Sequence, residues 1–388
     1  MDFGLTDEQR MILDTTREFV RRELLPLEAE VTRGELQGRD FPDHDTLRAL
    51  QQKAKTAGLW GLMTPEEYGG ANLGVLMTAL INIETARALI RFNYGGSADN
   101  ILYGCNDEQK GRYLLPVISG ERQSCFALTE PDTGSDATNI QMNAVHDGTD
   151  WVLNGRKVFI SGAETADFAI VFAVTDKDKR HRGGITAFLV DREMGWTTSR
   201  IPLMSNWSAS EVLFDDVRVP QYNVLGEVGR GFELAMAWIG NGRLLIPARA
   251  VGQAQRLLEM GLDYARGRKA FGQPIAEYQA IQWMLADSAV EIDQVKWSTL
   301  RAAWKADQGK DVRHEASMAK LAGAQMVWRV ADRMLQVHGG MGYTREVPIE
   351  RVLREVRVYR IFEGTDEIQK RAIARNLLRG HARIGAWD

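Results

Sequence analysis

The spacing of apolar residues changes twice along the chain, and this order limits the folds that the chain can adopt. Residues 6 to about 120 repeat apolar side chains at helical spacing, after a capping box formed by Thr6 and Gln9. Short apolar runs typical of strands follow up to about residue 218. Long helical patterns return from about residue 229. Because helices flank the strands instead of alternating with them, the pattern does not predict a doubly wound parallel sheet.

We therefore predict an α+β fold that is mainly α. Its N-terminal helical bundle covers residues 1–121, its middle β-barrel or β-sheet domain covers 122–228, and its C-terminal four-helix bundle covers 229–388. Within the middle domain, Asn154 and Gly155 separate two strand-like segments. This dipeptide favours a tight turn, so we expect a β-hairpin that turns there.

The glycine-rich segments do not have the spacing of a nucleotide-binding loop. GEVGRG (226–231) and HGGMGY (338–343) differ from GxGxxG and do not lie between a strand and a helix. We interpret both as turns at helix ends. The sequence also contains no Walker A loop and no GxSxG nucleophile elbow.

Composition argues against several classes of protein. Lys and Arg total 48 against 52 Asp and Glu, and this net charge of −4 does not favour nucleic-acid binding. Cys105 and Cys125 are too few for a disulfide framework and are typical of a reducing compartment. The six histidines lack the spacing of a zinc site. The N-terminus is unlike a signal peptide, and the apolar run 168–174 is too short to cross a bilayer, so we expect a cytoplasmic protein.

The loop after the first predicted strand has the composition of an anion-binding loop. Thr129, Thr133 and Ser135 lie in the segment FALTEPDTGSDATN, residues 126–139. Clustered hydroxyl and backbone N–H groups suit a nucleotide pyrophosphate. A turn held by its own side-chain hydrogen bonds is the alternative.

Two further segments combine an aromatic side chain with a polar one. Phe159 and Ser161 share one face of a predicted strand, where they could cover a planar ring or belong to a core. Arg268 and Phe271 flank a helix break at 272–274. There the guanidinium could bind a phosphate or the carbonyls of a helix end.

One carboxylate occupies an unusual local position. Glu363 follows Ile361 and Phe362 and precedes Gly364, whereas Thr365 predicts the N-cap of the next helix. Glu363 therefore lies outside that helix and beside apolar side chains. It is either a solvated loop carboxylate or one held in an apolar pocket, where desolvation would raise its pKa.

These segments, taken together and in this order, resemble the acyl-CoA dehydrogenase family. The resemblance rests on LTEPDTGSD, on KVFISG about thirty residues later, on RKAFGQPI, on QVHGGMGY and on FEGTDEIQ, and it extends from MDFGLTDEQR to ARNLLRG. TEPxxGSD and EGTxEIQ are its most specific parts.

The resemblance implies a reaction. An acyl-CoA thioester is dehydrogenated to a trans-2-enoyl-CoA: Glu363 takes the α-proton and the N5 of FAD accepts the β-hydride. It also implies that an electron-transfer flavoprotein accepts the electrons and that the protein is a homotetramer whose FAD is shared between subunits. Some branches of the family carry the base at the position of Gly242, which has no side chain.

The resemblance also implies the binding residues. Those expected to contact FAD are Phe126, Leu128, Thr129, Ser135, Phe159, Ser161, Arg268, Phe271, Gln336, Gly340, Thr365 and Glu367. Those expected to contact the acyl-CoA are Ser135, Arg243, Gly364 and Arg375.

Several positions depart from the family pattern. Phe159 replaces a common tryptophan, Ser161 replaces a common threonine, and Glu367 stands where glutamine is common. The segment 201–220 lacks a Gly-x-Arg sequence that many relatives carry. Chain length and branching of the acyl group depend on the shape of a cavity, which no motif encodes.

Two other classes of function remain as alternatives. An acyl-CoA oxidase or another oxygen-using flavoenzyme has the same scaffold, although monooxygenase and nitroalkane oxidase relatives lack a glutamate at the position of Glu363. A non-catalytic helical interaction protein would not need the residues that match the cofactor site.

Overall fold

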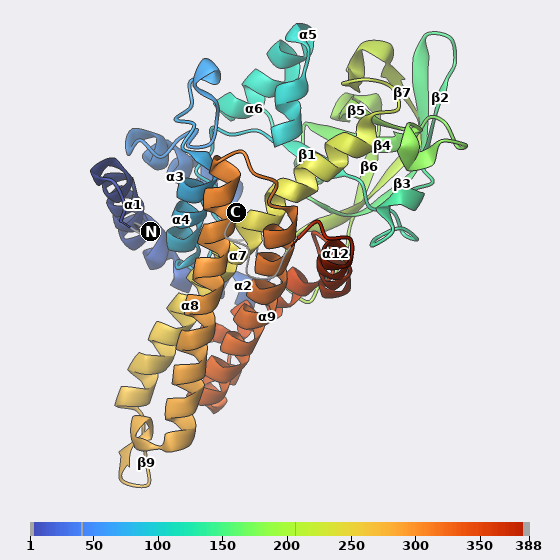
Figure 1. Cartoon of the computed structure of the whole chain (residues 1–388). Coiled ribbons are helices and arrows are strands. Elements are labelled where there is room, and N and C mark those ends of the chain that lie inside the picture. The colour runs from blue at the N-terminus through green and yellow to red at the C-terminus, as the bar shows by residue number, and fades with distance from the viewer. Residues whose placement is uncertain (1–3, 40–41, 206, 383–388) are drawn as a thin grey trace. The chain divides into compact units, whose positions relative to one another are not determined.

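The computed structural model describes residues 4–39, 42–205 and 207–382. It confirms the predicted order of helices, sheet and helices, which can be followed by colour in Figure 1. The chain divides into two compact units, which we describe separately. The helical unit comprises Met1–Met63, Ala71–Tyr94 and Gly242–Asp388, and the sheet unit comprises Thr64–Gly70 and Gly95–Asn241. The domain boundaries at 121 and 228 stay predictions.

The helical unit begins with the predicted cap. The Thr6 hydroxyl accepts the Gln9 N–H at 3.2 Å, and the Gln9 side chain accepts the Thr6 N–H at 3.0 Å, so two donors at the helix start are satisfied. The helices of this unit are α1 (Asp7–Phe19), α2 (Glu28–Leu36), α3 (His44–Thr56), α4 (Gly74–Ala86), the part of α7 (Gly231–Gly267) from Gly242 onward, α8 (Gln279–Asp307), α9 (Arg313–His338), α10 (Gly340–Tyr343), α11 (Ile349–Val356) and α12 (Asp366–Leu378).

Small residues fix the spacing between the long helices of this unit. A Cβ atom on Gly323 of α9 would lie 2.9 Å from Pro247 of α7, and one on Gly252 of α7 would lie 2.0 Å from the carbonyl oxygen of Ile83 on α4. These backbones therefore approach too closely for any larger side chain. Helix α9 also packs against α8, α11 and α12, and Figure 1 shows α8 and α9 side by side.

The sheet unit is built around two strands that are buried along their whole length. Strand β4 alternates between two cores: Phe168, Ile170 and Phe172 enter one, and Ala169 and Val171 enter the other. The strands are β1 (Ser124–Ala127), β2 (Asn143–His146), β3 (Asp150–Ser161), β4 (Phe168–Val174), β5 (Ile185–Asp191), β6 (Thr197–Arg200), β7 (Ala209–Pro220) and β8 (Val224–Leu225). They pair in the order β6-β7-β3-β2-β4-β5-β8, and β1 pairs in parallel with β4. The short helices α5 (Asp107–Gln109) and α6 (Leu115–Ser119) precede the first strand.

The hairpin predicted at Asn154 and Gly155 is wrong. Strand β3 continues through both residues, and its register with β7 shifts between Leu153 and Gly155. The Asn154 side chain donates to the Asp216 carboxylate at 2.9 Å and accepts the Asp216 N–H at 2.8 Å. A Cβ atom on Gly155 would lie 2.7 Å from the Met142 side chain. The dipeptide therefore forms a β-bulge, and the chain reverses earlier, between β2 and β3.

No helix within residues 4–39, 42–205 and 207–382 is long and apolar enough to cross a membrane. The same residues bring together no group of His, Cys, Asp and Glu side chains that could hold a metal ion.

Candidate active site

Glu363 lies in the loop between the 3₁₀ turn Arg357–Arg360 and helix α12. Its φ of 53° and the φ of 89° at Gly364 place two consecutive residues in the left-handed region. The Thr365 hydroxyl then accepts the Ile368 N–H at 3.2 Å and caps α12, as predicted. The left-handed conformation costs a non-glycine residue about 1–2 kcal/mol, so neighbouring contacts must hold it.

The side chain of Glu363 is half-buried, and one of its two carboxylate oxygens is enclosed. Its Oε2 is shielded from solvent and has no hydrogen-bond partner among the described residues. Burial raises the pKa of Glu363 to about 7, against the opposing charges of Arg243 and Lys320. Glu363 therefore fits a carboxylate held among apolar side chains better than a fully solvated loop carboxylate. The side chain is an unpaired acceptor whose affinity for a proton suits a general base near neutral pH.

Gly242 on α7 provides the space beside this carboxylate. A Cβ atom at that position would lie 3.1 Å from both Cδ and Oε2 of Glu363. Any larger residue at 242 would therefore displace the carboxylate. The carboxylate of Glu363 can occupy this space because residue 242 has no side chain.

Three side chains hold the main chain of the Glu363 loop. The carbonyl of Glu363 accepts hydrogen bonds from Arg243 Nε at 3.3 Å and from Gln369 Nε2 at 3.0 Å. The carbonyl of Gly364 accepts from Gln369 Nε2 at 3.1 Å and from Lys320 Nζ at 2.6 Å. Helices α7, α9 and α12 each contribute one of these donors, and together they stabilise the left-handed loop.

In the sheet unit, the segment that follows β1 is anchored by a buried ion pair. Lys157 Nζ lies 2.8 Å from Glu130 Oε1 and donates to the Leu128 carbonyl at 3.0 Å. The Glu130 carboxylate also accepts the backbone N–H groups of Gln141 and Met142. Desolvation lowers the pKa of Lys157 to about 8, against the opposing charge of Glu130. The sequence did not point to this pair, because an isolated Lys and Glu carry no periodic signal.

Phe159 is an exposed aromatic side chain in a strained position. It is 61% exposed and has a φ of 59°, at a register shift of β3 between Lys157 and Ile160. Ser161 is also exposed, whereas Ile160 between them is buried. The alternative of a core phenylalanine is therefore wrong. A ring held outward at some conformational cost is typical of a contact surface for a planar ligand.

The remaining predicted residues of the sheet unit lie in β1 and in the loop that follows it. Phe126 stacks on Trp238, with ring centroids 4.0 Å apart and planes inclined by 8°. Leu128 is buried, Thr129 is half-buried and its carbonyl accepts the Val158 N–H at 2.8 Å. Ser135 is exposed.

Six other predicted residues of the helical unit are exposed. Arg268 and Phe271 belong to the hairpin of β9 (Lys269–Ala270) and β10 (Gln273–Pro274), at the ends of α7 and α8 (Figure 1). Phe271 is 97% exposed at the hairpin tip, with a φ of 49°. The other exposed positions are Gln336, Gly340, Glu367 and Arg375.

Three domains of one protein family match this chain, in the order helical, sheet and helical. Residues 6–121 match the N-terminal domain of acyl-CoA dehydrogenases, residues 125–217 match the middle domain and residues 229–378 match the C-terminal domain. The chain belongs to the acyl-CoA dehydrogenase family. It is therefore an oxidoreductase of this family, whose members bind FAD.

Individual relatives match this acyl-CoA dehydrogenase over nearly the full length of both chains. It is 38% identical to the probable acyl-CoA dehydrogenase YngJ of Bacillus subtilis, over 98% of this chain and 100% of that protein. It is also 38% identical to the (R)-benzylsuccinyl-CoA dehydrogenase of Thauera aromatica, over 97% of each. The butyryl-CoA dehydrogenase of Megasphaera elsdenii has a similar structure, with a TM-score of 0.87, 32% identity and coverage of 98% and 100%.

The residues present in the sheet unit fit a flavin cofactor. Phe159 offers an exposed ring beside the exposed Ser161 hydroxyl. In the nearby loop, Thr133 Oγ1 is buried and has no hydrogen-bond partner within the described ranges. An unpartnered buried hydroxyl and an exposed aromatic ring on neighbouring segments suit a ligand that is both planar and polar.

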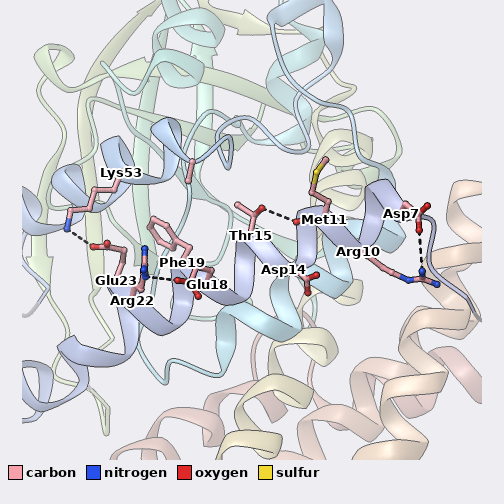
Figure 2. A pocket seen from close by; sticks show the side chains of 11 residues that line it. Asp7, Arg10, Met11, Asp14, Thr15, Glu18, Phe19, Arg22, Glu23 and Lys53 are labelled. Atoms are coloured by element: carbon pink, nitrogen blue, oxygen red, sulfur yellow. Dashed lines mark hydrogen bonds and ion pairs between the residues drawn. The ribbon is translucent and has the colours of Figure 1, made fainter.

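An open groove elsewhere on the helical unit is a poor candidate for the active site. It has a volume of about 690 Å³ and runs along α1 beside α3 (Figure 2). Its lining residues are Asp7, Arg10, Met11, Asp14, Thr15, Glu18, Phe19, Arg22, Glu23, Lys53 and Ala57. Its charged side chains pair with one another, as in Lys53 with Glu23 and Arg22 with Glu18. It includes none of the predicted site residues.

Proposed function

We propose that this acyl-CoA dehydrogenase converts an acyl-CoA thioester to a trans-2-enoyl-CoA, with Glu363 as the base. The observation that carries this proposal is the buried Oε2 of Glu363, which lacks a partner and borders the space left by Gly242. A thioester α-C–H is weakly acidic, so its base needs a raised proton affinity and a fixed position. The pKa of about 7 and the three donors to the loop provide both.

FAD, when bound, supplies the acceptor for the β-hydride at its N5 atom. The residues proposed to contact it are Phe126, Leu128, Thr129, Ser135, Phe159, Ser161, Thr365 and Glu367. The backbone anchoring of the Leu128–Thr129 segment by Lys157 supports this assignment, because a rigid segment can position a cofactor accurately. We further propose that Ser135, Arg243, Gly364 and Arg375 contact the CoA thioester.

We propose that the protein assembles as a homotetramer in which Arg268, Phe271, Gln336 and Gly340 reach the FAD of a neighbouring subunit. Exposed apolar side chains on α8 support an assembly. Trp283, Val290, Trp297 and Trp304 are all exposed and recur every seven residues, so they follow one face of the helix. An electron-transfer flavoprotein is the proposed electron acceptor, and the cytoplasmic location stays a prediction.

Anaerobic substrate titration tests the reaction. The purified protein should carry a yellow flavin, which a matching acyl-CoA should bleach before an artificial acceptor is added. The panel should include butyryl-CoA and benzylsuccinyl-CoA, after the names of the relatives, together with medium-chain and branched thioesters. If no member of the panel bleaches the flavin, the proposed dehydrogenation is wrong. Rapid reoxidation by oxygen would instead indicate an oxidase.

Substitution of Glu363 tests the assignment of the base. Glu363→Gln should keep flavin and ligand binding but lose turnover by at least about 10²- to 10⁴-fold, because the amide cannot accept the α-proton. Binding is measured by the spectral shift of the flavin on addition of a product-like thioester. Turnover close to that of the wild type would place the base elsewhere.

A further inference from the structure

Lys320 is a buried cation that takes no direct part in the proposed proton and hydride transfers. It lies on α9 and is 0% exposed. A lysine in such a place must make polar contacts, because removal of an ammonium group from water is unfavourable. The close approach of α9 to Pro247 at Gly323 fixes the helix one turn further on. The position of the Lys320 side chain is therefore set by the packing of the helical unit.

The ammonium of Lys320 binds the loop that carries Glu363. Its Nζ donates to the Gly364 carbonyl oxygen at 2.6 Å, the shortest of the recorded hydrogen bonds from side chains to the Glu363 and Gly364 carbonyls. This carbonyl belongs to the residue directly after Glu363. A shift of Gly364 would change both left-handed residues, since they are consecutive in the chain.

The charged groups around this loop come from four segments. Arg243 on α7 and Lys320 on α9 are cations that favour an ionised Glu363. Asp366 and Glu367 on α12 interact with the charge of Lys320. Asp366 is already paired with Arg360 of the preceding 3₁₀ turn, with 2.7 Å between Oδ2 and Nε, and it accepts Gln325 at 3.1 Å.

We propose that Lys320 is a positioning residue for Glu363: its ammonium fixes the Gly364 carbonyl, and its charge favours the ionised form of the neighbouring carboxylate. This inference rests on the proposed role of Glu363 as the base. It assigns two effects to one side chain, since the hydrogen bond acts on geometry and the charge acts on ionisation. The two effects can be separated by substitution.

The direction of the effect follows from the charges. Burial raises the pKa of Glu363 to about 7, and the positive charge of Lys320 opposes that rise. Loss of the charge should therefore raise the pKa of Glu363 further, so the base would ionise only at higher pH. At a pH below the pKa of Glu363, kcat/KM of the variant should fall about tenfold relative to wild type for each unit by which that pKa rises.

Two variants separate hydrogen bonding from charge. Lys320→Gln keeps a donor but loses the charge, and Lys320→Met loses both. Lys305→Met is the matched control, because Lys305 is also buried in the helical unit but pairs with Glu315 at 2.6 Å. The flavin-loaded proteins are compared by the pH profile of anaerobic flavin reduction. Infrared difference titration of the Glu363 carboxyl, assigned with Glu363→Gln, reports ionisation without turnover.

We expect both Lys320 variants to shift the midpoint of Glu363 to higher pH, and Lys320→Met also to lower the rate at the high-pH plateau. The Lys305→Met control should keep the wild-type midpoint. An unchanged midpoint in Lys320→Gln would overturn the proposal, and this variant decides the question if Lys320→Met fails to fold. If Glu363→Gln remains active, the proposed function fails, but the infrared midpoint still tests the effect of Lys320 on Glu363.

Discussion

A buried lysine anchors a predicted site segment in each of the two units, but the two lysines are neutralised differently. Lys157 of the sheet unit holds the Leu128 carbonyl and pairs with Glu130, which is itself buried. Lys320 of the helical unit holds the Gly364 carbonyl, and within the described ranges no carboxylate lies at salt-bridge distance from it. The first arrangement fixes a loop and neutralises the charge locally. The second fixes a loop, and its charge interacts at longer range with Asp366 and Glu363.

The comparison also shows why the two segments differ in strain. The segment at Leu128 and Thr129 leaves the end of β1 and is tied to β3 by the hydrogen bond from Val158 N–H to the Thr129 carbonyl. The Glu363 loop instead contains two left-handed residues and depends on side-chain donors. Backbone pairing with a strand supports the Leu128–Thr129 segment, whereas the Glu363 loop is held by side chains from three helices.

The largest expected effect comes from removal of the Lys157 anchor. Lys157→Met leaves the charge of Glu130 buried without its cation, which should cost about 3–5 kcal/mol of unfolding free energy. Denaturant unfolding of the purified variant measures this loss. The double variant Lys157→Met/Glu130→Gln should recover part of it, because no charge then remains buried. If both variants lose the same unfolding free energy, the packing of Lys157, and not its ion pair with Glu130, stabilises this segment.

A smaller effect should appear in the pH dependence of stability. Burial raises the pKa of Glu363 from 4.5 to about 7, so folding favours the protonated carboxyl. The stabilisation is fully present below pH 4.5 and is lost as the pH rises through about 7. Relative to wild type, Glu363→Gln should therefore gain up to about 3 kcal/mol of unfolding free energy between pH 4.5 and pH 8.

Asp147 in the sheet unit provides the control for that measurement, because its contribution to stability changes with pH in the opposite direction. Backbone N–H groups of Asp150 and Thr149, together with Arg218, lower the pKa of Asp147. The stability contributed by Asp147 is therefore present at neutral pH and lost in acid. Asp147→Asn should lose stability relative to wild type as the pH rises through the acid range. If Glu363→Gln showed that same slope, the carboxyl of Glu363 would not be buried in solution.

The smallest expected effect comes from filling the space beside Glu363. Gly242→Ala places a methyl group 3.1 Å from the carboxylate, and overpacking of this kind costs about 1–3 kcal/mol. We expect kcat/KM to fall at least about tenfold and the melting temperature to fall by a few degrees. Gly240→Ala is the matched control on α7, because a Cβ atom there meets nothing within 4 Å. If the two variants were equally active, the space at Gly242 would not be needed for the position of the Glu363 carboxylate.

The sequence predicted the arrangement of elements better than the environment of individual residues. Apolar periodicity was sufficient for the order of helices and strands, because burial of one face imposes it. The Asn154–Gly155 hairpin failed because the same dipeptide also suits a β-bulge, and only the pairing of β3 with β7 distinguishes the two.

The candidate site was predictable only in part. The cap at Thr365 placed Glu363 outside a helix, but its burial depends on α7 and α9, which are distant in sequence. Lys320 carries no local signal, since a polar residue on a helix usually faces water. Gln369 belongs to the EGTxEIQ segment, but that segment did not predict its hydrogen bonds to the loop. Their role as donors to the loop appears only when the helices are packed.

The space between Gly242 and Glu363 has a consequence for how such a site can change over generations. A glutamate introduced at 242 would collide with Glu363, and loss of Glu363 alone would leave no carboxylate in that space. Each single step therefore passes through an impaired protein, although the two changes together would restore one acid in the same volume. The carboxylate proposed as the base can therefore pass from position 363 to position 242 only if both residues change together.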